Sequence, residues 1–171
     1  LSGGIDSALV ATIATAALKA QKVSCILMPS PWSSTSSVKD ALDLAQRLEI
    51  KTKIVPINNL MSSFDSTLIT PLGELPKNIT AENLQARIRG TLLMAIANQQ
   101  NHLLLSTGNK SELAIGYCTL YGDMNGGLSV IGDLYKTSVF KLCEWLDSEE
   151  AYITRESLGL RSIGELIGTE I

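Results

Sequence analysis

The chain has 171 residues, with 14 Lys+Arg against 17 Asp+Glu and a formal net charge of −3. This length favours a single domain, and the acidic balance argues against a dedicated nucleic-acid binder, which usually carries excess basic charge. No apolar run approaches the roughly 18–20 residues that cross a membrane, so we expect no membrane partner. The scattered Cys25, Cys118 and Cys143 form no CxxC motif, which favours reduced thiols and a cytoplasmic protein.

Apolar patterning alternates between helical and strand-like segments along the chain. Helices are predicted over 6–20, 37–48, 58–70 and 80–100, and buried strands over 23–28, 53–57 and 102–106. Because parallel strands are joined through helices of this length, we expect a doubly wound parallel α/β sheet with helices on both faces. Ligands bind such sheets beyond the carboxyl ends of the strands. The segment before Asp6 and the loops 29–37 and 107–112 should therefore share one rim.

Several local features carry narrower predictions. Ser37 to Asp40 has the form of a helix-capping box, and Pro71 to Lys77 is expected to break the preceding helix. The glycine-rich stretch 118–133 is predicted to be an ordered functional loop. A short helix is expected near 162–167. His102, the single histidine, has no cysteine or acidic neighbour in sequence and is expected to be structural or exposed.

Residues 2–7, Ser-Gly-Gly-Ile-Asp-Ser, run directly into the first predicted helix. Adjacent glycines allow a tight turn with exposed N–H groups, and a helix N-terminus carries a positive dipole end. Together with two serine hydroxyls these groups suit a phosphate or pyrophosphate, although the Walker A pattern is absent. The alternative is a plain glycine turn with Asp6 or Ser7 as the helix N-cap.

This motif resembles the pyrophosphate-binding loop of the N-type ATP pyrophosphatases. Segments 83–90, 106–112 and 117–123 follow in an order and spacing similar to those of the NAD synthetase family. The resemblance implies an adenine nucleotide alpha hydrolase-like fold whose first strand precedes Leu1. It also implies that 1–171 is one ATP pyrophosphatase domain, incomplete at both ends, from a chain without an initiator Met.

The implied activity is ATP-dependent amidation of deamido-NAD to NAD, with an adenylated intermediate, Mg²⁺ as cofactor and no side-chain nucleophile. The resemblance assigns three groups of site residues. ATP and its pyrophosphate would contact Leu1, Ser2, Gly3, Gly4, Ile5, Asp6, Ser7, Thr107 and Lys136. Deamido-NAD would contact Asn83, Arg87, Glu112 and Asp123. Asp6 and Glu112 would hold the metal, since Mg²⁺ prefers carboxylate ligands completed by phosphate and water.

Each assignment has a plainer alternative on pattern alone. Asn109 and Glu112 have the spacing of an N-cap and its N3 partner. Lys136 also fits an ordinary surface lysine at a helix start. Asp123 also fits a turn, and Asn83 a solvated helix position. Arg87 and Arg89 are two residues apart on a helix, so they should point to different faces.

Two alternative functions remain open: another amidating ATP pyrophosphatase, such as a GMP synthetase, and a non-catalytic nucleotide-binding module. Within the family, Leu120 replaces a lysine typical of the ammonia-dependent branch, and Ile5 replaces a polar residue often found there. The chain thus looks more like the synthetase part of the glutamine-dependent branch. That likeness implies an amidase domain in the same longer chain, and we also expect a homo-oligomer.

Overall fold

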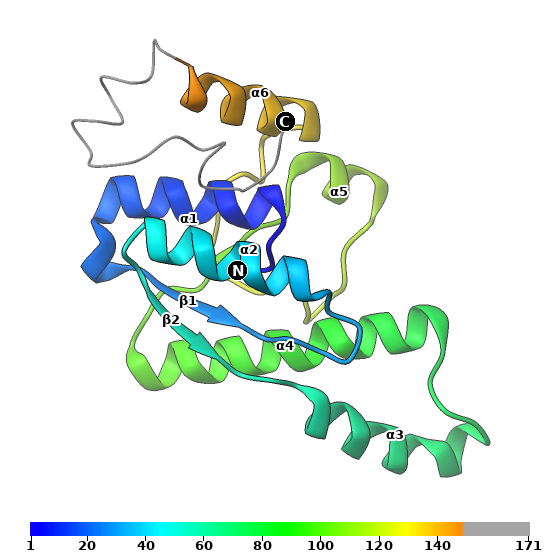
Figure 1. The fold of residues 1–171 in the computed structure, drawn as a ribbon. Helices are drawn as coiled ribbons and strands as arrows, with labels where there is room; N and C mark the ends of the chain where they lie inside the picture. The colour runs from blue at the N-terminus through cyan, green and yellow to red at the C-terminus, as the bar shows by residue number, and fades with distance from the viewer. Residues whose placement is uncertain (149–171) are drawn as a thin grey trace.

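The computed structural model describes residues 1–148, which form an α/β fold with parallel strand pairing (Figure 1). The elements in chain order are α1 (Ile5–Leu18), η1 (Ala20–Lys22), β1 (Ser24–Leu27), α2 (Thr35–Arg47), β2 (Lys51–Ile54), α3 (Asn58–Leu72), α4 (Asn78–Gln100), β3 (Leu105–Ser106), α5 (Lys110–Ile115), β4 (Leu128–Ser129) and α6 (Lys136–Asp147). The predicted alternation of helices and strands is confirmed. The helix expected near 162–167 lies outside the described residues.

Helices lie on both sides of the β1–β2 pair, as predicted. Figure 1 shows α1 and α2 on one side of these strands and α4 on the other. On the first side, Leu9 of α1 and Leu44 of α2 pack with Val139 of α6 in the larger apolar core. A smaller core joins Ile57 and Met61 to Ile88 of α4. The alanine-rich α1 is apolar around most of its circumference, which suits a helix buried between other elements.

The β1–β2 ladder is parallel, with Leu27 opposite Ile54. The second strand was predicted over 53–57, but it begins at Lys51 and ends at Ile54. Backbone bonds nevertheless continue beyond it, because the Val55 N–H donates to the Leu27 carbonyl at 2.8 Å and the Ile57 N–H to the Pro29 carbonyl at 3.0 Å. Pro56 has no N–H to donate between them, which explains the early end of the regular strand.

Two predicted helix boundaries differ in position from those in the structure. The N-cap of α2 is Ser34 rather than Ser37, because the Ser34 hydroxyl accepts the Ser37 N–H at 3.0 Å and one more turn becomes helical. Pro71 lies inside α3, which ends at Leu72 rather than at the predicted Thr70, but the predicted break over 71–77 is confirmed. The C-cap is Gly73, whose left-handed backbone (φ 73°) suits a residue without Cβ.

The strand predicted over 102–106 is regular only at Leu105 and Ser106, where it pairs in parallel with β4. β4 lies in the stretch 118–133 that was predicted to be loop only, and its two residues carry no alternating pattern that would reveal a strand. The Gly127 N–H extends this pairing by donating to the Leu104 carbonyl at 2.8 Å. Among residues 1–148, no helix is long and apolar enough to cross a bilayer.

Candidate active site

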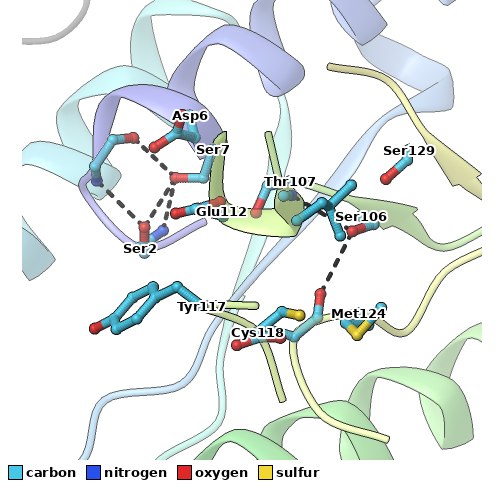
Figure 2. Close-up of a pocket in the computed structure, with 14 residues that line it drawn as sticks. Ser2, Asp6, Ser7, Ser106, Thr107, Glu112, Tyr117, Cys118, Met124 and Ser129 are labelled. Carbon is cyan, nitrogen blue, oxygen red and sulfur yellow. Dashed lines mark hydrogen bonds between the residues drawn. The ribbon is translucent and has the colours of Figure 1, made fainter. Parts of the chain in front are cut away.

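A cavity of about 240 Å³ opens where the start of α1, the end of β3 and the loop after α5 meet. Figure 2 shows Asp6, Ser7, Glu112 and Ser2 on one side of it and Ser129 and Met124 on the other. The lining residues are Ser2, Gly4, Asp6, Ser7, Ser106, Thr107, Gly108, Glu112, Leu113, Tyr117, Cys118, Asp123, Met124 and Ser129. The rim predicted from strand ends therefore exists for the segments before α1 and after β3.

The loop before α1 leaves the helix N-terminus open. Gly4 is the N-cap, and no side chain caps the helix, so the alternative in which Asp6 or Ser7 is the N-cap is wrong. The Ser7 hydroxyl instead donates to the Gly4 carbonyl at 3.0 Å and accepts the Ser2 N–H at 3.2 Å. These bonds fix the turn, while the first N–H groups of α1 have no side-chain acceptor. An uncapped helix N-terminus beside a cavity suits an anion.

Gly3 is required by packing. Its φ of 88° is left-handed, and a Cβ on this residue would lie 2.3 Å from the Ser37 carbonyl oxygen of α2. Gly4 differs, because a Cβ there would meet only the Ser2 hydroxyl, at 3.5 Å. Leu1 and Ile5 pack against the larger core, so their side chains face away from the cavity.

Asp6 is held by two partners from distant parts of the chain. One carboxylate oxygen accepts a hydrogen bond from the Asn109 side-chain amide at 3.1 Å. The other pairs with the Lys136 ammonium at the first residue of α6. The Lys136 N–H in turn donates to the Ser111 hydroxyl at 2.9 Å, which ties the start of α6 to α5. Lys136, predicted to reach ATP, thus contacts a residue of the cavity wall without lining the cavity itself.

Glu112 belongs to a complete capping box. Its N–H donates to the Asn109 side-chain oxygen at 3.1 Å, and its carboxylate accepts the Asn109 N–H at the same distance. The predicted N-cap and N3 pair is therefore confirmed. The Glu112 side chain also lines the cavity, so capping and a place in the site coexist.

Asn83 and Asp123 meet at Thr119. The Thr119 hydroxyl donates to the Asn83 side-chain oxygen and its N–H to the Asp123 carboxylate, each at 2.8 Å. The guanidinium of Arg87 donates to the Leu120 carbonyl at 3.1 Å. Asn83 and Arg87 on α4 therefore hold the loop that carries Asp123, although only Asp123 of these three lines the cavity.

The two arginines of α4 point to different places, as predicted. Arg89 donates to the Met28 carbonyl at the end of β1, at 3.1 and 2.9 Å, whereas Arg87 reaches the loop after α5. Burial lowers the pKa of Arg89. Close approach of α4 to that loop depends on Gly90, because a Cβ there would lie 2.7 Å from the Gly122 carbonyl oxygen.

Several residues that build the site were not predicted to belong to it. Asn109 was predicted only as a helix cap, and its bond to Asp6 has no local signal across 103 positions. Ser106 donates to the Asp123 carbonyl at 3.4 Å and links β3 to the loop. Its place at the end of a strand was the one available signal. The other unassigned wall residues are Gly108, Leu113, Tyr117, Cys118, Met124 and Ser129.

Cys143 lies behind the Asp6–Lys136 pair and is fully buried. Burial, reinforced by the negative charge of Asp6, raises the pKa of the Cys143 thiol to about 11. Burial likewise raises the pKa of Cys25. His102 is exposed, in agreement with the prediction.

The chain is similar to known proteins over most of its length. A family model described as NAD synthase matches residues 1–159. Over 153 residues the chain is 59% identical to a glutamine-dependent NAD(+) synthetase of Synechocystis sp. (strain ATCC 27184 / PCC 6803 / Kazusa), covering 90% of this chain and 27% of the relative.

Two solved structures share the fold. The glutamine-dependent NAD+ synthetase of Acinetobacter baumannii, in complex with ADP, aligns with a TM-score of 0.84 at 50% identity, covering 87% of this chain and 29% of that one. The NH3-dependent NAD synthetase of Campylobacter jejuni subsp. jejuni NCTC 11168 aligns with a TM-score of 0.77 at 38% identity, covering 91% and 66%.

Parallel strands between helices, with an open helix N-terminus behind a Ser-Gly-Gly turn, define an α/β fold of the nucleotide-hydrolase-like kind. The chain belongs to the NAD synthase family. It spans about a quarter of the length of the curated glutamine-dependent relatives that it matches.

Proposed function

We propose that the protein amidates deamido-NAD to NAD at the expense of ATP, releasing AMP and pyrophosphate. One observation carries this proposal. The uncapped N-terminus of α1 shares a single cavity with Asp6, Thr107, Glu112 and Asp123. The cavity therefore combines N–H groups that suit polyphosphate with carboxylates that suit a metal ion.

ATP would place its phosphates against residues 1–7. The backbone N–H groups of Gly3 and the first turn of α1 would face phosphate oxygens, and Leu1 and Ile5 would contribute through their backbone. The Gly4 N–H, which donates to the Ser2 hydroxyl at 3.2 Å, would exchange that partner for a phosphate oxygen. Thr107 lines the same cavity and would contact the nucleotide. Lys136 would move from Asp6 to the phosphates, which offer a denser negative charge.

Asp6 and Glu112 have the donor chemistry that Mg²⁺ prefers. Both are carboxylates in the wall of the same cavity, and no cluster of three or more metal-ligating side chains occurs among residues 1–148. Mg²⁺ is commonly bound through one or two carboxylates and substrate phosphates, so this pair fits it. When bound, the metal would neutralise charge on the leaving pyrophosphate.

Deamido-NAD would lie along the wall formed by the loop after α5, which Asn83 and Arg87 of α4 hold in place. Asp123 would contact it directly, Glu112 would adjoin its reacting end, and Asn83 and Arg87 would complete the site. The nicotinate carboxylate oxygen attacks the α-phosphorus of ATP, and pyrophosphate leaves. Ammonia then attacks the carbonyl carbon, and AMP departs with the oxygen that joined it to the acyl group. No side-chain nucleophile takes part in either step.

The nitrogen source is proposed to be glutamine, hydrolysed by an amidase domain in the same longer chain. This is supported by the curated relatives, whose printed names are glutamine-dependent and whose length exceeds that of this chain. Glutamine hydrolysis within residues 1–148 is disfavoured, because Cys25 and Cys143 are buried and no hydrogen bond joins the half-buried Cys118 to the exposed His102 in this part of the chain. The three cysteines are free thiols, which suits a cytoplasmic location. Leu60 and Phe64 are exposed on α3, so this helix offers apolar surface for a homo-oligomer.

A substrate screen on the full-length protein tests the proposal. Pyrophosphate, AMP and the amidated product are measured with ATP, Mg²⁺ and either deamido-NAD or xanthosine monophosphate, in the presence of ammonium or glutamine. We expect NAD, AMP and pyrophosphate in equal amounts with deamido-NAD, and no amidated product with xanthosine monophosphate. Turnover of xanthosine monophosphate would indicate a GMP synthetase, and ATP binding without pyrophosphate release would indicate a non-catalytic module.

A further inference from the structure

Asn109 makes more hydrogen bonds within the site than a helix cap requires. Its side chain is 1% exposed, between the first turns of α1 and α5. The side-chain oxygen accepts the Glu112 N–H, and the side-chain amide donates to Asp6, both at 3.1 Å. The Asn109 backbone N–H donates to the Glu112 carboxylate. One residue thus binds both carboxylates of the site, Asp6 through its side chain and Glu112 through its backbone.

The neighbours of Asn109 determine the orientation of its amide. The Glu112 N–H can only donate, so it requires the amide oxygen. The Asp6 carboxylate can only accept, so it requires the amide nitrogen. Both demands are met by one planar group whose two ends are fixed relative to each other.

An N-cap by itself does not need asparagine. Serine, threonine and aspartate cap helices about as well, because capping uses only an acceptor oxygen. The donor half of the Asn109 amide serves Asp6 alone. The cap of α2, Ser34, is an exposed serine whose side chain bonds only to groups of its own helix, namely the Ser37 N–H and the Ser36 and Ser37 hydroxyls. The difference between the two caps lies in the second function of Asn109.

We propose that Asn109 is a positioning residue, which aims the Asp6 carboxylate at the metal–nucleotide site while the same residue anchors Glu112. This inference rests on the proposed function, because it takes Asp6 and Glu112 as the metal ligands. Hydrogen-bonded partners of metal-binding carboxylates commonly contribute about 10–100-fold to metal affinity. Without the Asn109 donor, Asp6 keeps only Lys136, which draws its carboxylate toward α6.

The test is Asn109→Ser in the full-length protein, since serine retains the cap and is too short to reach Asp6. Binding of Mn²⁺ in the presence of α,β-methylene ATP, which cannot be cleaved, is followed by electron paramagnetic resonance, together with the melting temperature. Ser34→Ala is the matched control, because it removes a helix cap that does not line the cavity. Asp6→Asn and the double variant complete a thermodynamic cycle.

We expect Asn109→Ser to weaken Mn²⁺ binding by about 10–100-fold with a near wild-type melting temperature. In the Asp6→Asn background the same substitution should cause little further loss, because Asn109 acts through Asp6. Wild-type Mn²⁺ affinity in Asn109→Ser would overturn the inference. So would an equal loss in Ser34→Ala, which would assign the effect to stability. If the wild-type protein binds Mn²⁺ with the nucleotide but makes no NAD, the proposed reaction fails while the role of Asn109 stands.

Discussion

Lys136 at the start of α6 pairs with Asp6 in the first turn of α1, joining residues 130 positions apart. Behind this pair, Val139 and Cys143 of α6 pack into the same core as Leu9 and Val10 of α1. The pair therefore lies where a packed helix–helix contact meets the cavity. Core packing holds the two helices together, which leaves the Lys136 side chain free to exchange partners when a phosphate arrives.

Lys136→Met should weaken ATP binding far more than it destabilises the fold. The Lys136 side chain is 36% exposed, so its ion pair is worth under about 1 kcal/mol. A charge-assisted hydrogen bond to phosphate is worth about 1.5–3 kcal/mol, which corresponds to roughly a tenfold to hundredfold rise in the KM for ATP. Steady-state kinetics and thermal melting measure both effects. Lys141→Met, an exposed lysine on the same helix, should behave as wild type. An unchanged KM for ATP in Lys136→Met would refute this role.

Gly3→Ala and Gly4→Ala should differ sharply in stability. At Gly3 the new Cβ would lie 2.3 Å from a backbone oxygen of α2, in a left-handed conformation, and neither atom can move away cheaply. We expect a loss of more than about 2 kcal/mol in the free energy of unfolding. At Gly4 the nearest atom is a hydroxyl at 3.5 Å, so the loss should stay below about 1 kcal/mol. Equal losses in chemical denaturation would contradict the close contact between the loop and α2.

Thr119→Val should raise the KM for deamido-NAD and change the KM for ATP little. The hydroxyl of the buried Thr119 donates to Asn83, and its removal leaves the Asn83 oxygen without that donor and loosens the loop that carries Asp123. We expect roughly a tenfold effect, equivalent to about 1.4 kcal/mol. Thr119→Ser retains the hydroxyl and should restore most of the affinity. If serine and valine act alike, the hydroxyl has no such role.

Some of this site could be predicted from sequence, because its signals are local. The Asn109–Glu112 capping box is a three-residue spacing, and the Ser-Gly-Gly turn precedes an apolar helix directly. Contacts between distant segments left no such signal. Lys136 has the pattern of an ordinary surface lysine, yet it pairs with Asp6. The sequence pattern predicted the N-cap of α2 at Ser37 instead of Ser34, because the serine-rich segment offers several hydroxyl groups that could accept the capping hydrogen bond.

Alkaline pH should destabilise the protein through Cys143. The pKa of its thiol is raised in the folded state from about 9.0 to about 11, so the unfolded chain loses the proton first. This contribution to stability is complete below pH 9 and is lost as the pH rises through 11. The loss amounts to about 3 kcal/mol at most, because each pKa unit is worth about 1.4 kcal/mol.

Urea denaturation of Cys143→Ala between pH 8 and 11.5 measures this contribution. The variant should be less stable at neutral pH but should lose less stability on the way to high pH than wild type. Val139→Ala, equally buried on α6 and without an ionisable group, should keep the wild-type slope. A slope in Cys143→Ala equal to that of wild type would show that the thiol is not the group responsible.

Adenylation of the nicotinate carboxylate by ATP would move one carboxylate oxygen into AMP, so the fate of this oxygen distinguishes the proposed reaction from others. Deamido-NAD with a heavy isotope at both oxygens of this carboxylate is converted by the full-length protein with ATP, Mg²⁺ and ammonium, and the masses of the products are measured by mass spectrometry. Attack of the carboxylate on the α-phosphorus predicts one labelled oxygen in each AMP and none in pyrophosphate. Unlabelled AMP, or label in inorganic phosphate with ADP as the nucleotide product, would rule out adenylation of the carboxylate.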